Sequence, residues 1–406
     1  MSVFRWRPGN WAGLAGGLMA LLVCPALGAE AEMKLAEGHE GATGYVPLSS
    51  KPAEPAGKLP ALKSKKPLYA GLPLGDKPGD QVRLVLDESK GPGTGYDTLY
   101  VDANRNADLS DDGVIPFRKC LLNEGAYEAD PVRVTVRYAD GSQRAILVAV
   151  TCWSPAQISE EDGYLQYAVI EHLEGAITLG NAKVLVGLYD SGEPNGCFGD
   201  FGADRVKLIE EGKGGLADAP AMLLGRVLRY EDRLWELKVE GAGAKLSIKP
   251  YGGPVGRFKA SFAPSEGFSV RAVILRLSGA DGCHFDCRLT GDAGLELPAG
   301  SFRVGSSHVG LTDAAGAGWE LSVSCAQQLE VAAGQTTTLK LGAPFKVEPV
   351  LQKAARPGRA VPVACRITGA AGEVYGSVRQ GTPALPVVAV SDAAGKAVAG
   401  GKMEYG

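Results

Sequence analysis

Apolar and polar residues alternate over short stretches along most of the chain, and this pattern predicts β-strands. Residues 132–138 alternate in this way, and residues 146–150 alternate again after Asp140-Gly141, a dipeptide typical of tight turns. Residues 235–239 and 246–248 form a second pair of the same kind. Because side chains in a strand point to alternate faces, each pair predicts an antiparallel hairpin with one buried face. The expected fold class is therefore all-β.

The chain of 406 residues is longer than one ordinary domain, so we expect several compact units. Its 56 glycines and 25 prolines indicate many turns, and only residues 219–229 suit a helix as well as a strand. We expect a large antiparallel β domain followed by two small β modules. The predicted division is residues 1–29 as a signal peptide, 30–66 as a flexible linker rich in Lys and Pro, 67–262 as the large β domain, 263–342 as the first small module and 343–406 as the second.

The N-terminus has the order of residues found in a secretory signal peptide. Arg5 and Arg7 precede an apolar run over residues 11–23, Pro25 follows, and small residues lead to a cleavage point near Ala29. An uncleaved membrane anchor is the alternative, but the apolar run is short for a span. We therefore predict a protein exported to the periplasm, the cell envelope or the extracellular space, whose mature form does not span a membrane.

All of the 8 cysteines except Cys24 follow this cleavage point, and export permits disulfides. The remaining number is odd, so at least one thiol is left free or pairs between chains. Cysteines in separate predicted strands are the best candidates for bridges. We expect Cys287 to pair with Cys325 first and Cys120 with Cys152 next.

The densest group of oxygen-bearing side chains follows an apolar strand predicted at residues 98–101. Nearly every second side chain of the loop carries an oxygen, and hard divalent cations need several such ligands within a few ångströms. The sequence therefore predicts a calcium-binding loop. Its candidate ligands are Asp102, Asn104, Asn106, Asp108, Ser110, Asp111 and Asp112.

This first loop resembles the EF-hand-like loops of dockerin and thrombospondin type 3 repeats over about a dozen residues. Asp102, Asn104 and Asn106 match the first, third and fifth positions of such a loop. Leu109 matches the apolar eighth position and Ser110 the ninth. The resemblance implies a calcium loop.

The same loop departs from the EF-hand pattern in three respects. Ala107 replaces the turn glycine, Gly113 stands where the bidentate acid belongs, and a strand precedes the loop instead of a helix. Asp111 or Asp112 could supply the missing carboxylate one or two residues early. The resemblance therefore supports a metal loop and not an EF-hand fold.

A second apolar strand, predicted at residues 183–189, also runs into an acidic loop. Residues 195–200 match residues 106–111 as Asn, small, any, apolar, any, Asp. An acid precedes the Asn by five residues in the second loop and by four in the first, so one residue is inserted. We interpret the pair as an internal quasi-repeat, with solvated turns as the alternative for both loops. The candidate ligands of the second loop are Asp190, Asn195, Asp200 and Asp204, with Glu193 as a further candidate.

The stretch from Leu297 to Val304, L-P-A-G-S-F-R-V, places a Pro-Gly turn before a strand. It resembles the L-P-x-G-x-aromatic-x-V signature of transthyretin-like and carboxypeptidase-regulatory-like modules. The resemblance implies an Ig-like β-sandwich without catalysis for residues 263–342. The last segment, 343–406, is similar to the Ig-like units that end many exported bacterial proteins, so we expect two small Ig-like β-sandwich modules.

The functional expectation rests on the loops, the export signal and the overall charge. The formal net charge is −4 and the only basic run is residues 63–66, so nucleic acid is not an expected partner. The chain resembles exported bacterial proteins that combine D-x-N-x-N loops with Ig-like units. We expect an exported calcium-binding (Ca2+) module for binding, adhesion or the cell envelope, with a protein or polysaccharide partner. The alternative is an extracellular hydrolase that acts on a polymer through loop carboxylates.

Overall fold

The computed structural model shows an all-β protein whose sheets are mostly antiparallel. In the described part of the chain, the helical content is a short 3-10 turn, η2 (Leu216–Asp218), and no helix has the length and apolar character needed to cross a membrane. The predicted signal peptide lies almost wholly outside the described residues. The structure describes residues 28–38, 43–52, 57–120, 125–153, 158, 163–279, 282–289, 294–325, 327–351, 363–380, 382–383, 387–391 and 394–402.

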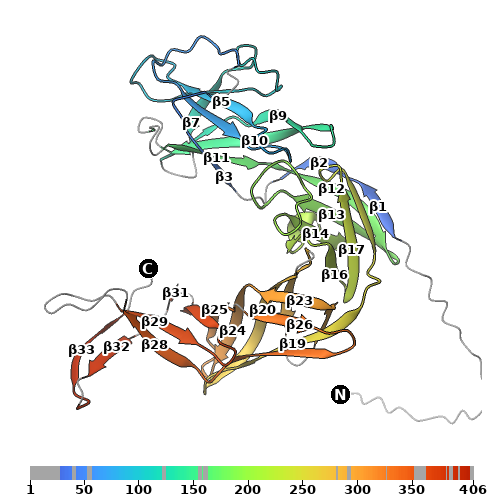
Figure 1. Ribbon diagram of the computed structural model, residues 1–406, viewed down its shortest axis with the longest axis vertical. Coiled ribbons are helices and arrows are strands. Elements are labelled where there is room, and N and C mark those ends of the chain that lie inside the picture. The colour runs from blue at the N-terminus through green and yellow to red at the C-terminus, as the bar shows by residue number, and fades with distance from the viewer. Residues whose placement is uncertain are drawn as a thin grey trace, which may run out of the picture.

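Eight strands form a nearly closed, barrel-like sheet in the order β3-β11-β10-β8-β7-β6-β5-β4 (Figure 1). A bridge between Ser49 and Tyr69 joins the segment after β3 to β4 and brings the two edges of the sheet together. Strand β9 pairs with β10 off this path. The strands are β3 (Gly44–Pro47), β4 (Leu68–Leu72), β5 (Val82–Asp87), β6 (Thr98–Val101), β7 (Ile115–Lys119), β8 (Ala126–Ala129), β9 (Val132–Arg137), β10 (Gln143–Trp153) and β11 (Tyr164–Val169).

Two smaller sheets combine the first two strands of the chain with strands that follow the barrel, in the orders β15-β14-β13-β12-β2 and β1-β18-β17-β16. Buried residues of both sheets belong to the same hydrophobic core cluster as those of the barrel. The strands are β1 (Ala29–Glu32), β2 (Lys34–Glu37), β12 (Glu171–Leu179), β13 (Ala182–Tyr189), β14 (Arg205–Glu210), β15 (Met222–Leu223), β16 (Val227–Tyr230), β17 (Arg233–Glu240) and β18 (Lys245–Pro250).

Strands β19 to β27 and β30 contribute buried residues to a second hydrophobic core. One sheet has the order β22-β19-β27, with β19 and β27 parallel, and the other runs β26-β23-β20-β24-β25-β30-β29-β28. Strand β21 pairs with β20, β31 with β30, and β32 with β33. The bounds are β19 (Val255–Ala263), β20 (Phe268–Gly279), β21 (His284–Leu289), β22 (Leu295–Pro298), β23 (Gly300–Val304), β24 (Ser306–Asp313), β25 (Gly318–Ser324), β26 (Gln328–Val331), β27 (Thr336–Gly342), β28 (Lys346–Leu351), β29 (Val363–Thr368), β30 (Val374–Gln380), β31 (Thr382–Pro383), β32 (Val387–Ser391) and β33 (Ala397–Lys402).

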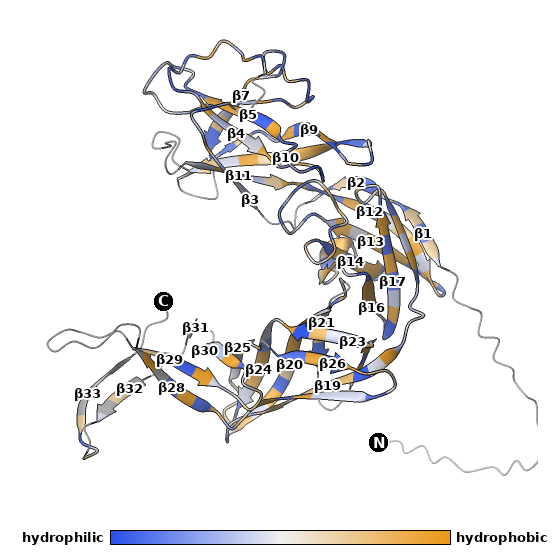
Figure 2. Ribbon diagram, viewed as in Figure 1, coloured by the Kyte–Doolittle hydropathy of each residue, from blue (hydrophilic) through white to orange (hydrophobic). Residues whose placement is uncertain are grey.

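The hairpins predicted from alternation are confirmed. Strand β9 pairs with β10 and β17 pairs with β18, both antiparallel. The alternation of hydrophobic and hydrophilic residues along the strands can be followed in Figure 2. Residues 219–229, whose pattern also suited a helix, contain the strand β15 and most of β16. In β10 every second residue from Ile146 onward is buried, including Val148 and Val150. This alternating burial explains the apolar–polar alternation from which the hairpin of β9 and β10 was predicted.

The described part of residues 30–66, predicted as a flexible linker, contains strands up to residue 47. Strand β1 pairs with β18, β2 with β12 and β3 with β11. Ala31 and Met33 are buried in the first core. Each of these strands extends a sheet at its edge, where it forms backbone hydrogen bonds with one neighbouring strand.

The predicted module boundaries do not follow the sheets. Strand β19 begins at Val255 and pairs with β22 and β27, so the second core starts before residue 263. Strand β30 pairs with β25, so one sheet runs across the boundary drawn between residues 342 and 343. Figure 1 shows β28 to β30 continuing the sheet of β20 to β25.

The predicted disulfide between Cys120 and Cys152 is incompatible with the sheet. Strand β8 lies between the two cysteines, because Tyr127 pairs with Lys119 on one side and with Cys152 on the other. Two strand spacings amount to about 10 Å, whereas a disulfide needs Cα atoms within about 7 Å. Cys287 and Cys325 are both buried in the second core and form no disulfide with each other in the described structure, so that pairing remains a prediction.

Candidate functional site

The first acidic loop connects β6 to β7 and is folded by its own backbone and side chains. Arg105 and Ala107 have φ of 62° and 65°, in the left-handed region. Ala107 therefore adopts the conformation that the turn glycine supplies in an EF-hand loop, at some cost in strain. Leu109, at the apolar eighth position, is buried. The departure at Ala107 leaves the turn itself intact.

Side-chain oxygens of Asp102, Asn104 and Asn106 accept hydrogen bonds from backbone N–H groups later in the first loop. The Ala107 N–H donates to Asp102 Oδ2 at 3.2 Å and the Asn106 N–H donates to Asn104 Oδ1 at 2.9 Å. The Asp108 N–H donates to Asn106 Oδ1 at 2.7 Å. Each of these oxygens has a second lone pair. They can therefore accept these bonds and still coordinate a cation.

Two carboxylate oxygens of this loop are buried without a hydrogen-bond partner. They are Asp102 Oδ1, on a residue that is 4% exposed, and Asp112 Oδ2. Burial raises the pKa of Asp112 to about 6, and the charges of Asp102, Asp111 and Asp108 add to that effect. A cation between these carboxylates would satisfy the oxygens and offset the repulsion.

Other candidate ligands of the first loop are engaged elsewhere. Asp108 Oδ2 accepts a bond from Lys58 Nζ at 2.8 Å, and its Oδ1 accepts bonds from the N–H and the hydroxyl of Ser110. The Asn106 amide donates to Asp111 Oδ2 at 2.7 Å. Across the described residues, no three His, Cys, Asp or Glu side chains are grouped to hold a metal ion. A cation here would therefore also need amide or backbone oxygens.

The second loop repeats the hydrogen bonds of the first. The Gly196 N–H donates to Asp190 Oδ2 at 2.6 Å, as the Ala107 N–H donates to Asp102. The Asn195 amide donates to Asp200 Oδ2 at 2.8 Å, and its Oδ1 accepts from the Cys197 N–H at 2.8 Å. The first loop has both of these bonds at the matching positions.

The match extends to conformation and burial. Gly196 has a φ of 77° where Ala107 has 65°. Phe198 is fully buried where Leu109 is buried. Asp190 Oδ1 is buried without a hydrogen-bond partner, as is Asp102 Oδ1. The quasi-repeat predicted from sequence is thus also a repeat of local structure.

The second loop carries two nearly fully buried acids. Asp190 is 2% exposed, and burial together with the charge of Asp204 raises its pKa well above the ordinary value. Burial also raises the pKa of Asp204 to about 7, although its oxygens accept bonds from the N–H groups of Ser191 and Asp200. Without a cation, these acids favour the protonated form.

The second loop is also wedged between the barrel and the two smaller sheets. The Gly75 N–H donates to Asn195 O at 2.6 Å, and the Tyr138 hydroxyl donates to Gly196 O at 2.8 Å. The Phe198 N–H donates to the carbonyl of Ala242, in the turn between β17 and β18. No local pattern in the sequence predicts these contacts, because the partners lie far apart along the chain.

Strand β9 contacts both loops. The Thr135 N–H donates to Ala103 O in the first loop at 2.8 Å, and Arg137 donates to Arg105 O at 2.7 Å. Tyr138, just past the end of β9, binds the second loop as described above. The sequence predicted β9 as part of a hairpin and missed its place between the two loops.

Comparisons with protein-family models, with curated proteins and with solved structures find no match for this chain.

Proposed function

We propose that the chain binds calcium in both acidic loops and acts as an exported binding, adhesion or cell-envelope module. One observation carries the calcium proposal. In the part of the chain that the structure describes, the buried carboxylate oxygens without a hydrogen-bond partner all belong to these loops: Asp102 Oδ1, Asp112 Oδ2 and Asp190 Oδ1. Buried acids are costly unless a donor or a cation satisfies them, and two independent loops share this arrangement.

The residues present fit calcium better than magnesium. Calcium accepts six to eight oxygen ligands in flexible geometry, including amide and backbone oxygens, whereas magnesium needs near-octahedral geometry. In the first loop Asp102 and Asp112 would supply charge, with the oxygens of Asn104 and Asn106 beside them. In the second loop the acids would be Asp190, Asp200 and Asp204, with Asn195. The ion would supply positive charge to carboxylates that otherwise repel one another.

The burial of Asp190 and Asp204 favours a non-catalytic binding module over a hydrolase. Asp190 and Asp204 have raised pKa values, as catalytic acids often do, but they are 2% and 1% exposed. A cavity of about 340 Å³ lies beside the second loop and is lined by Asp76, Asp80 and Glu193. Asp80 pairs with Arg105, and Asp76 accepts a bond from the Ala139 N–H. Asp76 and Asp80 are thus tied into the fold, which supports a structural role for the calcium and a protein or polysaccharide partner bound elsewhere.

Thermal unfolding tests the proposal at the first loop. Sites of extracellular type have Kd values of about 10⁻⁴ to 10⁻³ M, so millimolar calcium should add about 1 kcal/mol to the free energy of unfolding. Asp102→Ala should remove most of the first loop's share of this shift. The matched control is Asp130→Ala, whose carboxylate is exposed and pairs with Arg118, and it should keep the whole shift. Identical melting of the wild-type protein in calcium and in chelator would contradict the proposal.

A further inference from the structure

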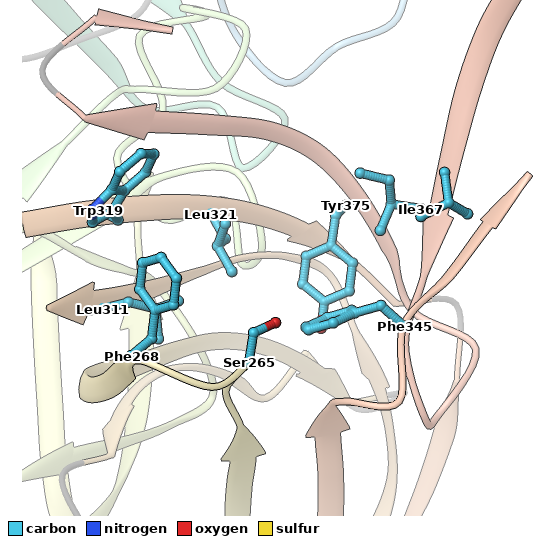
Figure 3. Close-up of a pocket in the computed structure, with 9 residues that line it drawn as sticks. Ser265, Phe268, Leu311, Trp319, Leu321, Phe345, Ile367 and Tyr375 are labelled. Atoms are coloured by element: carbon cyan, nitrogen blue, oxygen red, sulfur yellow. The ribbon is translucent and has the colours of Figure 1, made fainter. Parts of the chain in front are cut away.

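A cavity of about 300 Å³ opens where the sheet of β20 to β25 continues into β28 to β30 (Figure 3). Side chains from six strands line it, including Leu311 of β24, Leu321 of β25 and Ile367 of β29. Its surface is almost wholly apolar. It is remote in sequence from both acidic loops and plays no part in the calcium proposal.

Two aromatic pairs form facing walls of this cavity. Phe268 and Trp319 meet edge to face with ring centroids 5.9 Å apart, and Phe345 and Tyr375 do so at 5.3 Å. Figure 3 shows the first pair on one side of the cavity and the second pair on the other, with Leu321 between them. Aromatic rings prefer such edge-to-face or offset contacts, so a flat ring between the walls gains favourable contacts from both.

The polar atoms of both walls are already bound outside the cavity. Trp319 Nε1 donates to Asp313 Oδ2 at 2.9 Å. The Tyr375 hydroxyl donates at 2.6 Å to Glu373, which is fully buried and also accepts bonds from the N–H groups of Gly342 and Ala371. These bonds fix the rings and leave the indole and phenol with no donor for a ligand. Ser265 is the one lining residue whose side chain could still offer a hydroxyl.

We propose that this cavity binds a small uncharged aromatic molecule of one or two fused rings. A sugar would bury hydroxyl groups without partners, and a charged ligand would lose its hydration without an ion pair, so both are disfavoured. A dry cavity of about 150 Å³ is enough to bind benzene, and ligand pockets of about 300 Å³ are at the small end of the usual range. The cavity volume and the aromatic walls therefore determine the size and shape of the ligand, and hydrogen bonds contribute little to its binding.

The test is a titration of the full chain with fluorobenzene, followed by ¹⁹F NMR, with methyl glucoside as the polar probe. We expect saturable fluorobenzene binding and none for the glucoside. Leu321→Trp fills the cavity and Phe268→Ala removes part of one wall, and each should weaken fluorobenzene binding about tenfold or more. Ile274→Trp places the same indole on an exposed position of β20 outside the cavity and should leave binding unchanged.

Three results would overturn the proposal. Fluorobenzene could fail to bind in a saturable way, the glucoside could bind the same site, or Leu321→Trp and Phe268→Ala could both bind as the wild type does. Phe268 is only half-buried, so Phe268→Ala gives a folded comparison if Leu321→Trp fails to fold.

Discussion

Phe198→Ala is expected to lower the free energy of unfolding by about 3–5 kcal/mol, the cost of emptying a large aromatic site in a packed core. Phe198 is fully buried in the second acidic loop. The Arg144 guanidinium of β10 lies 5.8 Å from its ring centroid and donates to Ala242 O at 3.0 Å. The Phe198 side chain, with Arg144 against its ring, therefore links the second loop to the barrel and to the turn between β17 and β18. Equilibrium unfolding in urea measures the change.

The control for this substitution is Val114→Ala, because Val114 is 61% exposed. It should change the free energy of unfolding by less than about 0.5 kcal/mol. A loss of under about 1 kcal/mol for Phe198→Ala would show that the second loop is not an integral part of the core. It would also argue against Phe198 and Leu109 having the same role as buried residues that fix each loop to the core.

Asp190→Asn is expected to reverse the order of stability between chelator and calcium. In chelator the variant should melt above the wild type, because the amide keeps an acceptor for the Gly196 N–H and, unlike the buried acid beside Asp204, does not have to take up a proton to stay neutral on folding. In millimolar calcium the wild type should regain about 1 kcal/mol or more from the ion, and the variant should lose the second loop's part of it. Glu211→Gln, an exposed carboxylate paired with Lys183, is the control that should show no reversal.

The raised pKa values also predict how the stability of the wild-type protein in chelator and in calcium depends on pH. Asp204 and Asp112 ionise at about 7 and about 6 in the folded protein and near 3.8 in the unfolded chain. The folded state therefore holds protons that the unfolded state has lost, so stability in chelator falls as the pH rises from about 4 to about 7. Asp108, whose pKa of about 2 is lowered by Lys58 and Ser110, acts below this window. In calcium, stability should decrease less over this pH range. A protein that becomes more stable in chelator as the pH rises through this range would contradict the account.

The sequence predicted features that are local in the chain. Alternation alone was enough for β9 and β10, because each strand buries one face and exposes the other. The relation between the two acidic loops also came from short-range spacing. The same Asn-to-Asp step produces the same side-chain bond in each loop, Asn106 to Asp111 and Asn195 to Asp200.

The features that the sequence missed depend on contacts between distant segments. Ala29 of β1 pairs with Ile248, more than two hundred residues away, and the alternation of residues 29–35 is short and lies next to a segment rich in Lys and Pro. Strand β30 joins β25 across the expected module boundary for a similar reason, since pairing of distant strand edges leaves no local pattern. The burial of the unpartnered oxygens likewise depends on the tertiary fold.

Calorimetric titration of calcium into the chelator-treated full chain at neutral pH tests the central claim most directly. The account predicts saturable binding of two calcium ions per chain, with Kd values of about 10⁻⁴ to 10⁻³ M and weaker binding of magnesium. Asp102→Ala should leave one ion and the double variant Asp102→Ala/Asp190→Ala none. Absence of saturable calcium binding by the wild-type chain, or unchanged binding by the double variant, would contradict it.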